Sequence, residues 1–418
     1  MKQIIILLFL GPFLLQAQGL NWSTRAELED ANEITIMDYG YSSSSLPASH
    51  DMLKYAPPVE DQNGGTCVGF AAGYCAHSTM LNKALGITNT LQKDMFAMDP
   101  YFLYSLANSK IDEPCEEGMT FTQFFKGLEN VGNMRALYPP NASCDFDWLD
   151  YSGELNDELI DNFSAAFPFR IDDYGQIDLE KVDWMNTMKY YLANDVPVVI
   201  GAFVDEDFQN LSSENNGLWN YRSEESETLG GHAMCILGYN DYKYGGAFLV
   251  RNSWGTTFGA NGNVWIKYSD FKKVIGEAWV IYPDESVENS YSSSEYSFNL
   301  KSTLDENLDY RLIKASDGDI YEGFYAEDRQ VWAFHLINNG AVYFGQFINY
   351  VKHGVGYFCT PDGELYEARF YNGEFIEGQE LGYSSNDSKL AQEFMSSLES
   401  NTDSQLFNGD IPSLKIVK

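Results

Sequence analysis

The order of hydrophobic patterns between residues 46 and 284 constrains the fold of this chain more than any other feature. The first half of this region has helical periodicity, and the second half has short runs rich in valine, isoleucine and aromatic residues. No long polar break separates the two halves. Helices followed by strands indicate an α+β domain with two lobes.

The individual elements follow from the same patterns. Helices are predicted at 67–85, 99–108, 120–131 and 182–192, the third with a capping box formed by Thr120 and Gln123. Strands are predicted at 197–204, 232–239, 246–252, 263–268 and 277–283.

A second unit is predicted after a linker at 285–305, which is rich in serine and glutamate. Residues 306–383 contain a repeat in which Tyr321, Tyr343 and Tyr366 are spaced by 22 and 23 residues. Aromatic residues alternate with small ones in each repeat, and glycine-bearing turns follow, which predicts a stack of β-hairpins. The remaining residues, 384–418, are predicted to form a C-terminal tail.

The first 17 residues have the layout of a secretory signal peptide, with Lys2, an apolar run and a small residue at Ala17. The apolar run is shorter than the roughly 20 residues of a membrane-spanning helix, so no membrane span is predicted. Residues 18–45 form a short N-terminal extension. We therefore expect an exported protein, either extracellular, periplasmic or lumenal.

The charge of the chain excludes two classes of partner. With 61 acidic residues against 26 lysines and arginines, the formal net charge is -35. Nucleic acids and anionic membranes both require a basic surface, so neither is an expected partner. A protein partner at the hairpin unit remains a possibility for this acidic chain.

Four residues have the chemistry of a thiol-dependent catalyst. Cys67 stands where two glycines end and a helix begins, and a helix N-terminus favours a thiolate. His232 is the histidine best placed to serve as its base, and Asn252 at the end of the next strand could orient the imidazole. The Gln62 side chain and the Cys67 N–H could stabilise an oxyanion. No cysteine has metal-ligand spacing with a histidine, so neither a metal nor another cofactor is predicted.

Three blocks that contain these residues resemble the catalytic blocks of papain-family cysteine peptidases. They are "PPVEDQNGGTCVGFAAGYC", "GGHAMCILGYND" and "RNSWGTTFGANGNVWI", and they occur in the family's order of glutamine, cysteine, histidine and asparagine. The resemblance covers residues 46–284. It implies a papain-like fold in which a helical lobe packs beside a β-barrel-like lobe, while the spacing of the C-terminal repeats resembles MORN repeats.

The resemblance also implies roles for further residues. Gly118, Gly231 and Trp254 are expected to contact a peptide or protein substrate. Cys115 and Cys144 lie where the family often has disulfide partners. Residues 18–45 are too few for the long inhibitory pro-segment common in the family, which leads us to expect that latency does not depend on one.

Two departures from the family pattern leave alternatives open. Val68 follows the nucleophile where tryptophan is usual, as in some bacterial members, and the interval from Gln62 to Cys67 is one residue short. The sequence predicts a secreted cysteine peptidase that forms a thioester acyl-enzyme. A catalytically weak pseudopeptidase that binds peptides or proteins is the alternative, and an acyltransferase with the same thioester chemistry is a third reading.

Overall fold

The structure is a computed structural model with two units. It describes residues 19–33, 46–108, 115–136, 166, 169–222, 228–283, 296–301, 309–325, 331–349, 351–362 and 364–383. The predicted signal peptide and the C-terminal tail lie outside these residues.

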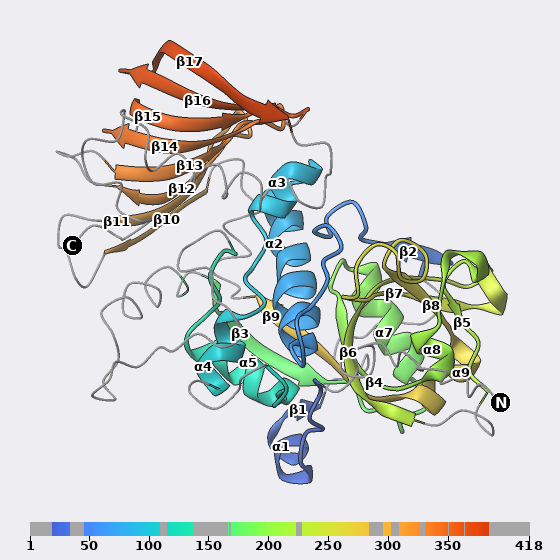
Figure 1. The fold of residues 1–418 in the computed structure, drawn as a ribbon. Helices are drawn as coiled ribbons and strands as arrows, with labels where there is room; N and C mark the ends of the chain where they lie inside the picture. The colour runs from blue at the N-terminus through green and yellow to red at the C-terminus, as the bar shows by residue number, and fades with distance from the viewer. Residues whose placement is uncertain are drawn as a thin grey trace, which may run out of the picture.

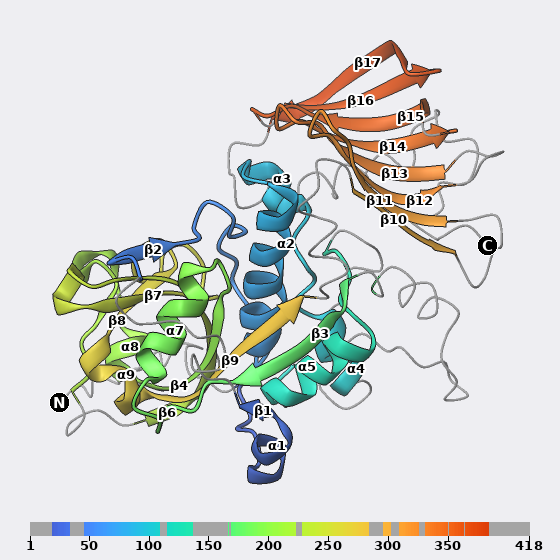
Figure 2. The ribbon, with the colours of Figure 1, turned by 180° about the vertical axis from the view of Figure 1, so that it is seen from behind.

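The first unit contains a helical lobe and a sheet lobe that lie side by side (Figures 1 and 2). The helices are α1 (Arg25–Asp30), η3 (Gly69–His77), α2 (Ser78–Leu85), α3 (Thr90–Met95), α4 (Phe102–Asn108), α5 (Phe121–Asn130), α7 (Trp184–Ala193), α8 (Glu206–Gln209) and α9 (Tyr268–Val274), with short turns η5 (Ser213–Asn215) and η6 (Lys243–Gly245). The predicted capping box at Thr120 and Gln123 begins α5. The predicted α+β arrangement is confirmed.

A nine-stranded sheet forms the other lobe and extends toward the helices. Its strands are β1 (Asn32–Glu33), β2 (Ser49–Asp51), β3 (Ile171–Gln176), β4 (Val198–Asp205), β5 (Leu218–Trp219), β6 (Thr228–Asn240), β7 (Ala247–Arg251), β8 (Asn263–Lys267) and β9 (Ile275–Pro283). They are ordered β1-β3-β9-β4-β6-β7-β8-β5, with β2 paired to β6. The antiparallel pairing of β6 with β7 brings His232 on β6 close to Asn252, which directly follows β7.

The second unit is an eight-stranded antiparallel sheet in chain order. Its strands are β10 (Tyr296–Lys301), β11 (Asp309–Lys314), β12 (Ile320–Tyr325), β13 (Val331–Leu336), β14 (Val342–Ile348), β15 (Val351–Cys359), β16 (Glu364–Tyr371) and β17 (Glu374–Tyr383). The predicted hairpins are confirmed. Strand β10 lies inside the predicted linker at 285–305. The sequence did not predict this strand, because its pattern is short and lies among serines.

A row of small residues explains the sequence repeat of this second unit. Neighbouring strands align these residues across the sheet: Gly323, Ala333, Gly345, Gly356, Ala368 and Gly378. The Tyr343 ring covers two of them, because a Cβ at Gly345 or Gly356 would come within 2.4 Å of its atoms. This packing of an aromatic ring over glycines requires an aromatic residue and a glycine at a fixed spacing in each hairpin, which gives the repeat in the sequence.

The second unit packs directly on the helical lobe near α2 and α3 (Figures 1 and 2). Arg135 forms an ion pair with Glu322 at 3.2 Å, and the two side chains are 2% and 0% exposed. The Gln92 amide donates to the Ile337 and Ala341 carbonyls at 2.8 and 3.2 Å. One hydrophobic core continues from the helical lobe into the sheet. The two units therefore share a buried interface.

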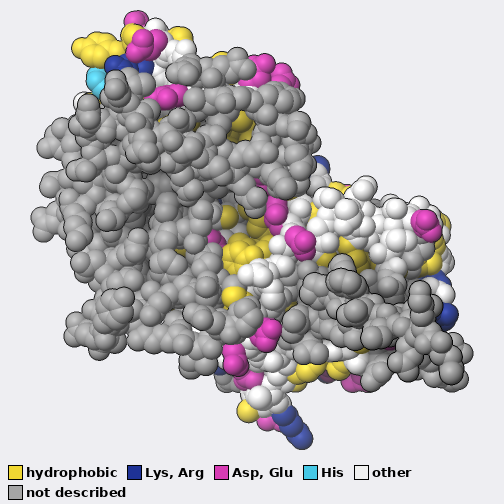
Figure 3. Space-filling view, in the orientation of Figure 1, with side chains coloured by type: hydrophobic (Ala, Val, Ile, Leu, Met, Phe, Trp, Pro, Cys, Tyr) yellow, Lys and Arg dark blue, Asp and Glu magenta, His cyan; other side chains and the backbone are white. Residues whose placement is uncertain are grey.

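The end of this sheet that contains β15, β16 and β17 carries exposed apolar side chains, and Figure 3 shows hydrophobic and basic groups at this end. The exposed apolar residues at this end are Val351, Tyr371, Phe375 and Ile376.

Within the described part of the chain, no helix has the length and apolar character needed to cross a membrane.

Candidate active site

Cys67 begins the long helix that continues through η3 and α2. Its side chain is buried between the two lobes. Backbone groups of Ala233, of Gly19 and of the helix start at Cys67 and Val68 hydrogen-bond with the thiol. Cys67 thus lies at a helix N-terminus, as the sequence predicts, and it also lies beside Ala233 of strand β6.

His232 and Asn252 lie next to each other, as the hairpin of β6 and β7 predicts. The His232 Nε2 atom is 2.7 Å from the Asn252 Oδ1 atom. Trp254 lies against the imidazole, with ring centroids 4.8 Å apart, and shields this hydrogen bond from water. The His232 Nδ1 atom has no hydrogen-bond partner among the described residues, so this nitrogen is free to accept a proton.

Burial holds both reacting groups in their neutral forms. It raises the pKa of the Cys67 thiol to about 12. It lowers the pKa of His232 to about 4, although the hydrogen bond that His232 donates to the Asn252 Oδ1 atom acts in the opposite direction. Because loss of solvent disfavours a charge on either group, a thiolate and imidazolium pair requires a more open site.

Gln62 is buried and held by two hydrogen bonds. Its Nε2 atom donates to the Gly64 carbonyl at 2.8 Å, and its Oε1 atom accepts from the Ser253 hydroxyl at 2.6 Å. The amide carries two hydrogens, so one remains for an oxyanion. Gly64 has a φ of 57°, a conformation that glycine accepts readily in the shortened loop.

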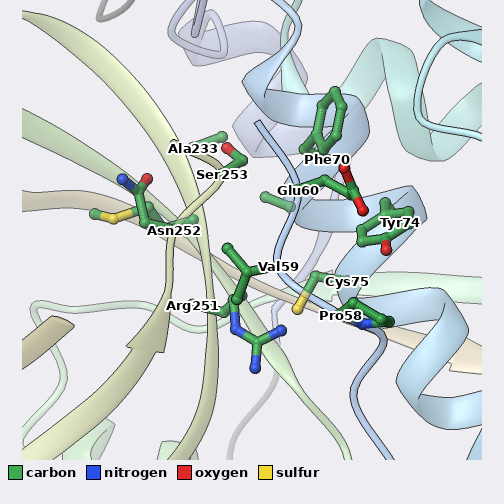
Figure 4. A pocket seen from close by; sticks show the side chains of 12 residues that line it. Pro58, Val59, Glu60, Phe70, Tyr74, Cys75, Ala233, Arg251, Asn252 and Ser253 are labelled. Carbon is green, nitrogen blue, oxygen red and sulfur yellow. The ribbon is translucent and has the colours of Figure 1, made fainter. Parts of the chain in front are cut away.

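A small pocket lies between the lobes beside these residues, and Figure 4 shows it from close by. Its walls come from helix η3 on one side and from strands β6 and β7 on the other: Phe70, Tyr74 and Cys75 face Ala233, Arg251, Asn252 and Ser253. The two lobes therefore meet next to Asn252 and Ser253.

Residues 19–30, called the cleft segment here, lie across this site. Met119 donates its N–H to the Gly19 carbonyl and accepts from the Asn21 N–H, each at 3.1 Å, which makes a parallel bridge between Leu20 and Met119. The Leu20 N–H also donates to the Gly231 carbonyl at 3.3 Å. The segment thus covers Cys67 with main-chain hydrogen bonds of the kind that an extended peptide forms.

Side chains anchor the cleft segment beyond these bonds, and one of them is Asn21, whose Nδ2 atom donates to the Glu117 carbonyl at 2.8 Å. Leu20 is buried, and Trp22 stacks on Phe203 with ring centroids 4.2 Å apart. The Ser23 N–H and hydroxyl donate to the Glu277 carboxylate at 2.8 and 2.9 Å. Helix α1 then leaves the surface of the cleft.

The predicted substrate residues Gly118 and Gly231 both lie against the cleft segment. A Cβ at Gly118 would come within 2.4 Å of the Gly19 carbonyl oxygen, and one at Gly231 within 2.7 Å of the Leu20 oxygen. The cleft segment belongs to the short extension at 18–45, and it occupies the site. The expectation that latency does not depend on a long pro-segment stays a prediction.

Sequence reasoning missed Met119, Ser253, Glu277 and the cleft segment as parts of the site. Ser253 adjoins Asn252 in the motif, which is a usable signal. Residues 19–23 carry alternating apolar side chains, but the sequence gives no indication of where they bind.

The other cysteines lie outside the catalytic arrangement. Cys75 and Cys235 are buried with hydrogen-bonded thiols, and Cys359 is buried in the second unit. Cys115 is disulfide-bonded, while its predicted partner Cys144 lies outside the described residues, so the pairing stays a prediction. The described residues contain no cluster of three or more metal-ligating side chains.

Comparison with known families finds a match within the first unit. Residues 156–282 match the family model described as papain family cysteine protease. This part of the chain is therefore similar to papain-family cysteine proteases. The matched residues include His232, Asn252 and Trp254.

Two curated relatives match parts of the chain. The uncharacterized peptidase C1-like protein L477 of Acanthamoeba polyphaga mimivirus is 32% identical over 114 residues, which cover 26% of this chain and 36% of that protein. The gamete and mating-type specific protein A of Dictyostelium discoideum is 26% identical over 223 residues, or 53% of this chain and 42% of that protein. The chain thus spans less than half of the length of either relative.

Solved structures of cysteine proteases are also similar to this chain. Xylellain from Xylella fastidiosa has a TM-score of 0.46 and 20% identity, and the match covers 65% of this chain and 98% of that one. The digestive procathepsin L2 of Tenebrio molitor has a TM-score of 0.49 and 21% identity, with 65% and 81% covered.

Proposed function

We propose that the chain is a working cysteine peptidase that is latent while the cleft segment covers Cys67. The observation that carries the proposal is the hydrogen bond between His232 and Asn252, together with a buried Cys67 thiol that the backbone of Gly19 in the cleft segment contacts. Similarity to the family alone does not establish a working site.

The reaction follows from the positions of these groups. The Cys67 thiolate attacks the carbonyl carbon of a peptide bond, and the Cys67 N–H and Gln62 amide stabilise the resulting oxyanion. His232 gives its proton to the leaving amine, which leaves a thioester. It then takes a proton from water, whose oxygen attacks the thioester and releases the acid. Asn252 keeps the imidazole in one orientation throughout.

Latency follows from the cleft segment. While it is bound, its backbone occupies the edge that a substrate would use, and burial keeps the thiol protonated. Removal of the segment admits water, which lets the thiol and imidazole ionise as a pair. Separation of the segment from the folded domain therefore activates the enzyme.

The test uses an epoxide inhibitor directed at papain-like thiols, followed by peptide mapping. A recognition site for a specific protease, inserted within residues 34–45, allows the folded chain to be cut and the segment washed away. We expect stoichiometric labelling at Cys67 after cutting, and none in Cys67→Ala. The buried thiol of Cys359 is the internal control. A folded, cut protein that does not react at Cys67 would favour the pseudopeptidase.

We also propose that the chain is exported and that the second unit is a MORN-like platform for a protein partner. The predicted signal peptide supports export. The hairpins with their aligned glycine row support the MORN resemblance. Detection of the unlabelled protein outside the producing cell, with residues 1–17 removed, tests the first point.

A further inference from the structure

Cys75 and Cys235 form a pair of thiols in the first unit that the catalytic scheme above does not use. Cys75 lies on helix η3 and Cys235 on strand β6, and the two residues are 3% and 0% exposed. Both are free cysteines, and their thiols hydrogen-bond with each other. The helical lobe and the sheet lobe therefore meet at this point through two sulfur atoms.

The same helix and the same strand carry the catalytic residues. Cys67 begins the helix, and its thiol hydrogen-bonds with the backbone of Ala233, the residue after His232 on β6. Alternate residues of a strand share a face, so Cys235 faces the helix as Ala233 does, and both belong to the core that includes η3. Cys75 follows Cys67 along the helix as Cys235 follows Ala233 along the strand. A covalent bond between the two thiols would thus join the lobes next to the catalytic residues.

A positive charge lies beside the two thiols. Arg251 on β7 pairs with Cys235 in the strand register. Its guanidinium donates to the Pro57 carbonyl at 2.7 Å and to the Asn263 Oδ1 atom at 2.9 Å. These acceptors are neutral, so they orient the guanidinium without cancelling its charge. Arg251 and Cys75 both line the small pocket between the lobes (Figure 4), where the charge can stabilise a thiolate.

The surroundings give the two sulfur atoms different roles. Burial alone would raise the pKa of the Cys75 thiol, but the hydrogen bond with Cys235 and the charge of Arg251 place this pKa below its ordinary value. Burial raises the pKa of the Cys235 thiol, and the hydrogen bond with Cys75 raises it further. Cys75 is therefore the nucleophile of the pair, and Cys235 is the proton donor that stabilises it.

We propose that Cys75 and Cys235 are a redox-active pair that hydrogen peroxide oxidises to a disulfide between the two lobes. The Cys75 sulfur attacks one peroxide oxygen, the O–O bond breaks, and the leaving hydroxide takes the proton that Cys75 has lost. The Cys235 sulfur then attacks the sulfur of the Cys75 sulfenic acid, the S–O bond breaks, and water leaves with the Cys235 proton. The two thiols lose two electrons, and one peroxide is reduced to two waters.

The disulfide has a direct consequence for stability. Hydrogen-bonded thiols already face each other, so closure requires rotation of the side chains and a small approach of the helix to the strand. The bond would close a loop of roughly 160 residues, and cross-links that close long loops restrict the unfolded chain most. We therefore expect the oxidised chain to keep its two lobes together at temperatures at which the reduced chain unfolds.

The test uses the full, uncut chain with Cys67→Ala, so that the catalytic thiol does not compete for the oxidant. The folded protein is treated with hydrogen peroxide, alkylated after denaturation and mapped by mass spectrometry without reduction. We expect one new pair of linked peptides, which contains Cys75 and Cys235 and has two hydrogen atoms fewer than the separate peptides. The midpoint of thermal unfolding should rise by about 5 to 10 °C.

Two variants in the same background identify the cause. Cys235→Ala should abolish both the link and the rise in the midpoint, and it should leave Cys75 as a sulfenic acid that a cyclic dione reagent labels. Cys359→Ala, which removes a buried thiol of the second unit, is the matched control and should keep both effects.

Three results would overturn the proposal. They are a folded, peroxide-treated chain in which both thiols stay reduced, a link from Cys75 to a cysteine other than Cys235, and a link that forms without a rise in the midpoint. If Cys235→Ala does not fold, the peptide map and the midpoint of its parent decide. Labelling of Cys67 plays no part in these readouts, so this proposal and the proposed function fail separately.

Discussion

Two buried contact regions of this molecule are built in different ways. In the cleft, residues 19–23 are held by main-chain hydrogen bonds to Met119 and Gly231, together with anchoring side chains. At the interface with the second unit, side chains dominate, because a shared hydrophobic core surrounds the ion pair of Arg135 and Glu322. The cleft is thus a site where one peptide can replace another, whereas the interface fits one partner only.

The difference indicates which of the two contact regions, the cleft or the interface between the units, can separate while the protein stays folded. Main-chain pairing accepts any extended peptide, so a substrate can take the place of the cleft segment. The ion pair at the interface is fully desolvated, and separation of the units would leave both charges without a partner. We expect the segment to leave a folded enzyme and the second unit to stay attached.

The largest effect is expected in the alkylation of Cys67 by iodoacetamide before and after the segment is cut away. In the uncut chain, burial raises the thiol pKa to about 12, so the rate should be low at neutral pH and rise with pH up to pH 10. In the cut chain, pairing with His232 should lower the thiol pKa, as in other activated cysteines, and the rate at pH 7 should be at least about 100-fold higher. Equal rates in both forms would show that the segment does not control the thiol.

The interface should respond to the loss of one charge. Glu322→Ala removes the carboxylate that pairs with the buried Arg135 and should lower the free energy of unfolding by about 3 to 5 kcal/mol. Chemical denaturation measures this change. Glu374→Ala, a change on the exposed β17, is the control and should have little effect. A loss below about 1 kcal/mol would mean that the two units are only loosely joined.

The glycine row should tolerate no added methyl group. In Gly356→Ala the new Cβ would lie 2.4 Å from the Tyr343 ring, so we expect destabilisation by about 1 to 3 kcal/mol. Thermal unfolding detects it. In the Tyr343→Ala background the same change should cost much less, and equal costs in both backgrounds would exclude the contact as the cause.

The smallest effect is expected from one anchor of the cleft segment. Trp22→Ala removes the stack on Phe203, worth about 0.5 to 1.5 kcal/mol, and should raise the peptide hydrolysis of the uncut chain by up to about tenfold. Arg25→Ala on the exposed part of α1 should leave it unchanged. A decrease with Trp22→Ala would mean that the segment supports the site and does not block it.

Local patterns were enough to predict most of the fold. The five predicted strands 197–204, 232–239, 246–252, 263–268 and 277–283 correspond to β4, β6, β7, β8 and β9. The contact between His232 and Asn252 agrees with the hairpin of β6 and β7, because the spacing of two strands in a hairpin fixes where their ends meet. The catalytic roles of Cys67, His232 and Asn252 stay predictions.

Contacts between distant segments could not be predicted in this way. The bond from Ser23 to Glu277 joins residues 254 positions apart, and the ion pair of Arg135 and Glu322 joins residues 187 apart. Periodicity describes which face of an element is buried, but it does not identify the partner of that face. The strand β10 was missed for a local reason, since its pattern is short and lies among serines.

Hydrolysis of a fluorogenic peptide tests the central claim most directly. The uncut chain, the chain freed of the cleft segment, and the freed Cys67→Ala variant are assayed side by side. The account predicts turnover by the freed chain, much slower turnover by the uncut chain, and a loss of about 10⁵-fold in the freed variant. A freed, folded chain that does not hydrolyse peptides that bind in its cleft, or a Cys67→Ala variant as active as the parent, would contradict it.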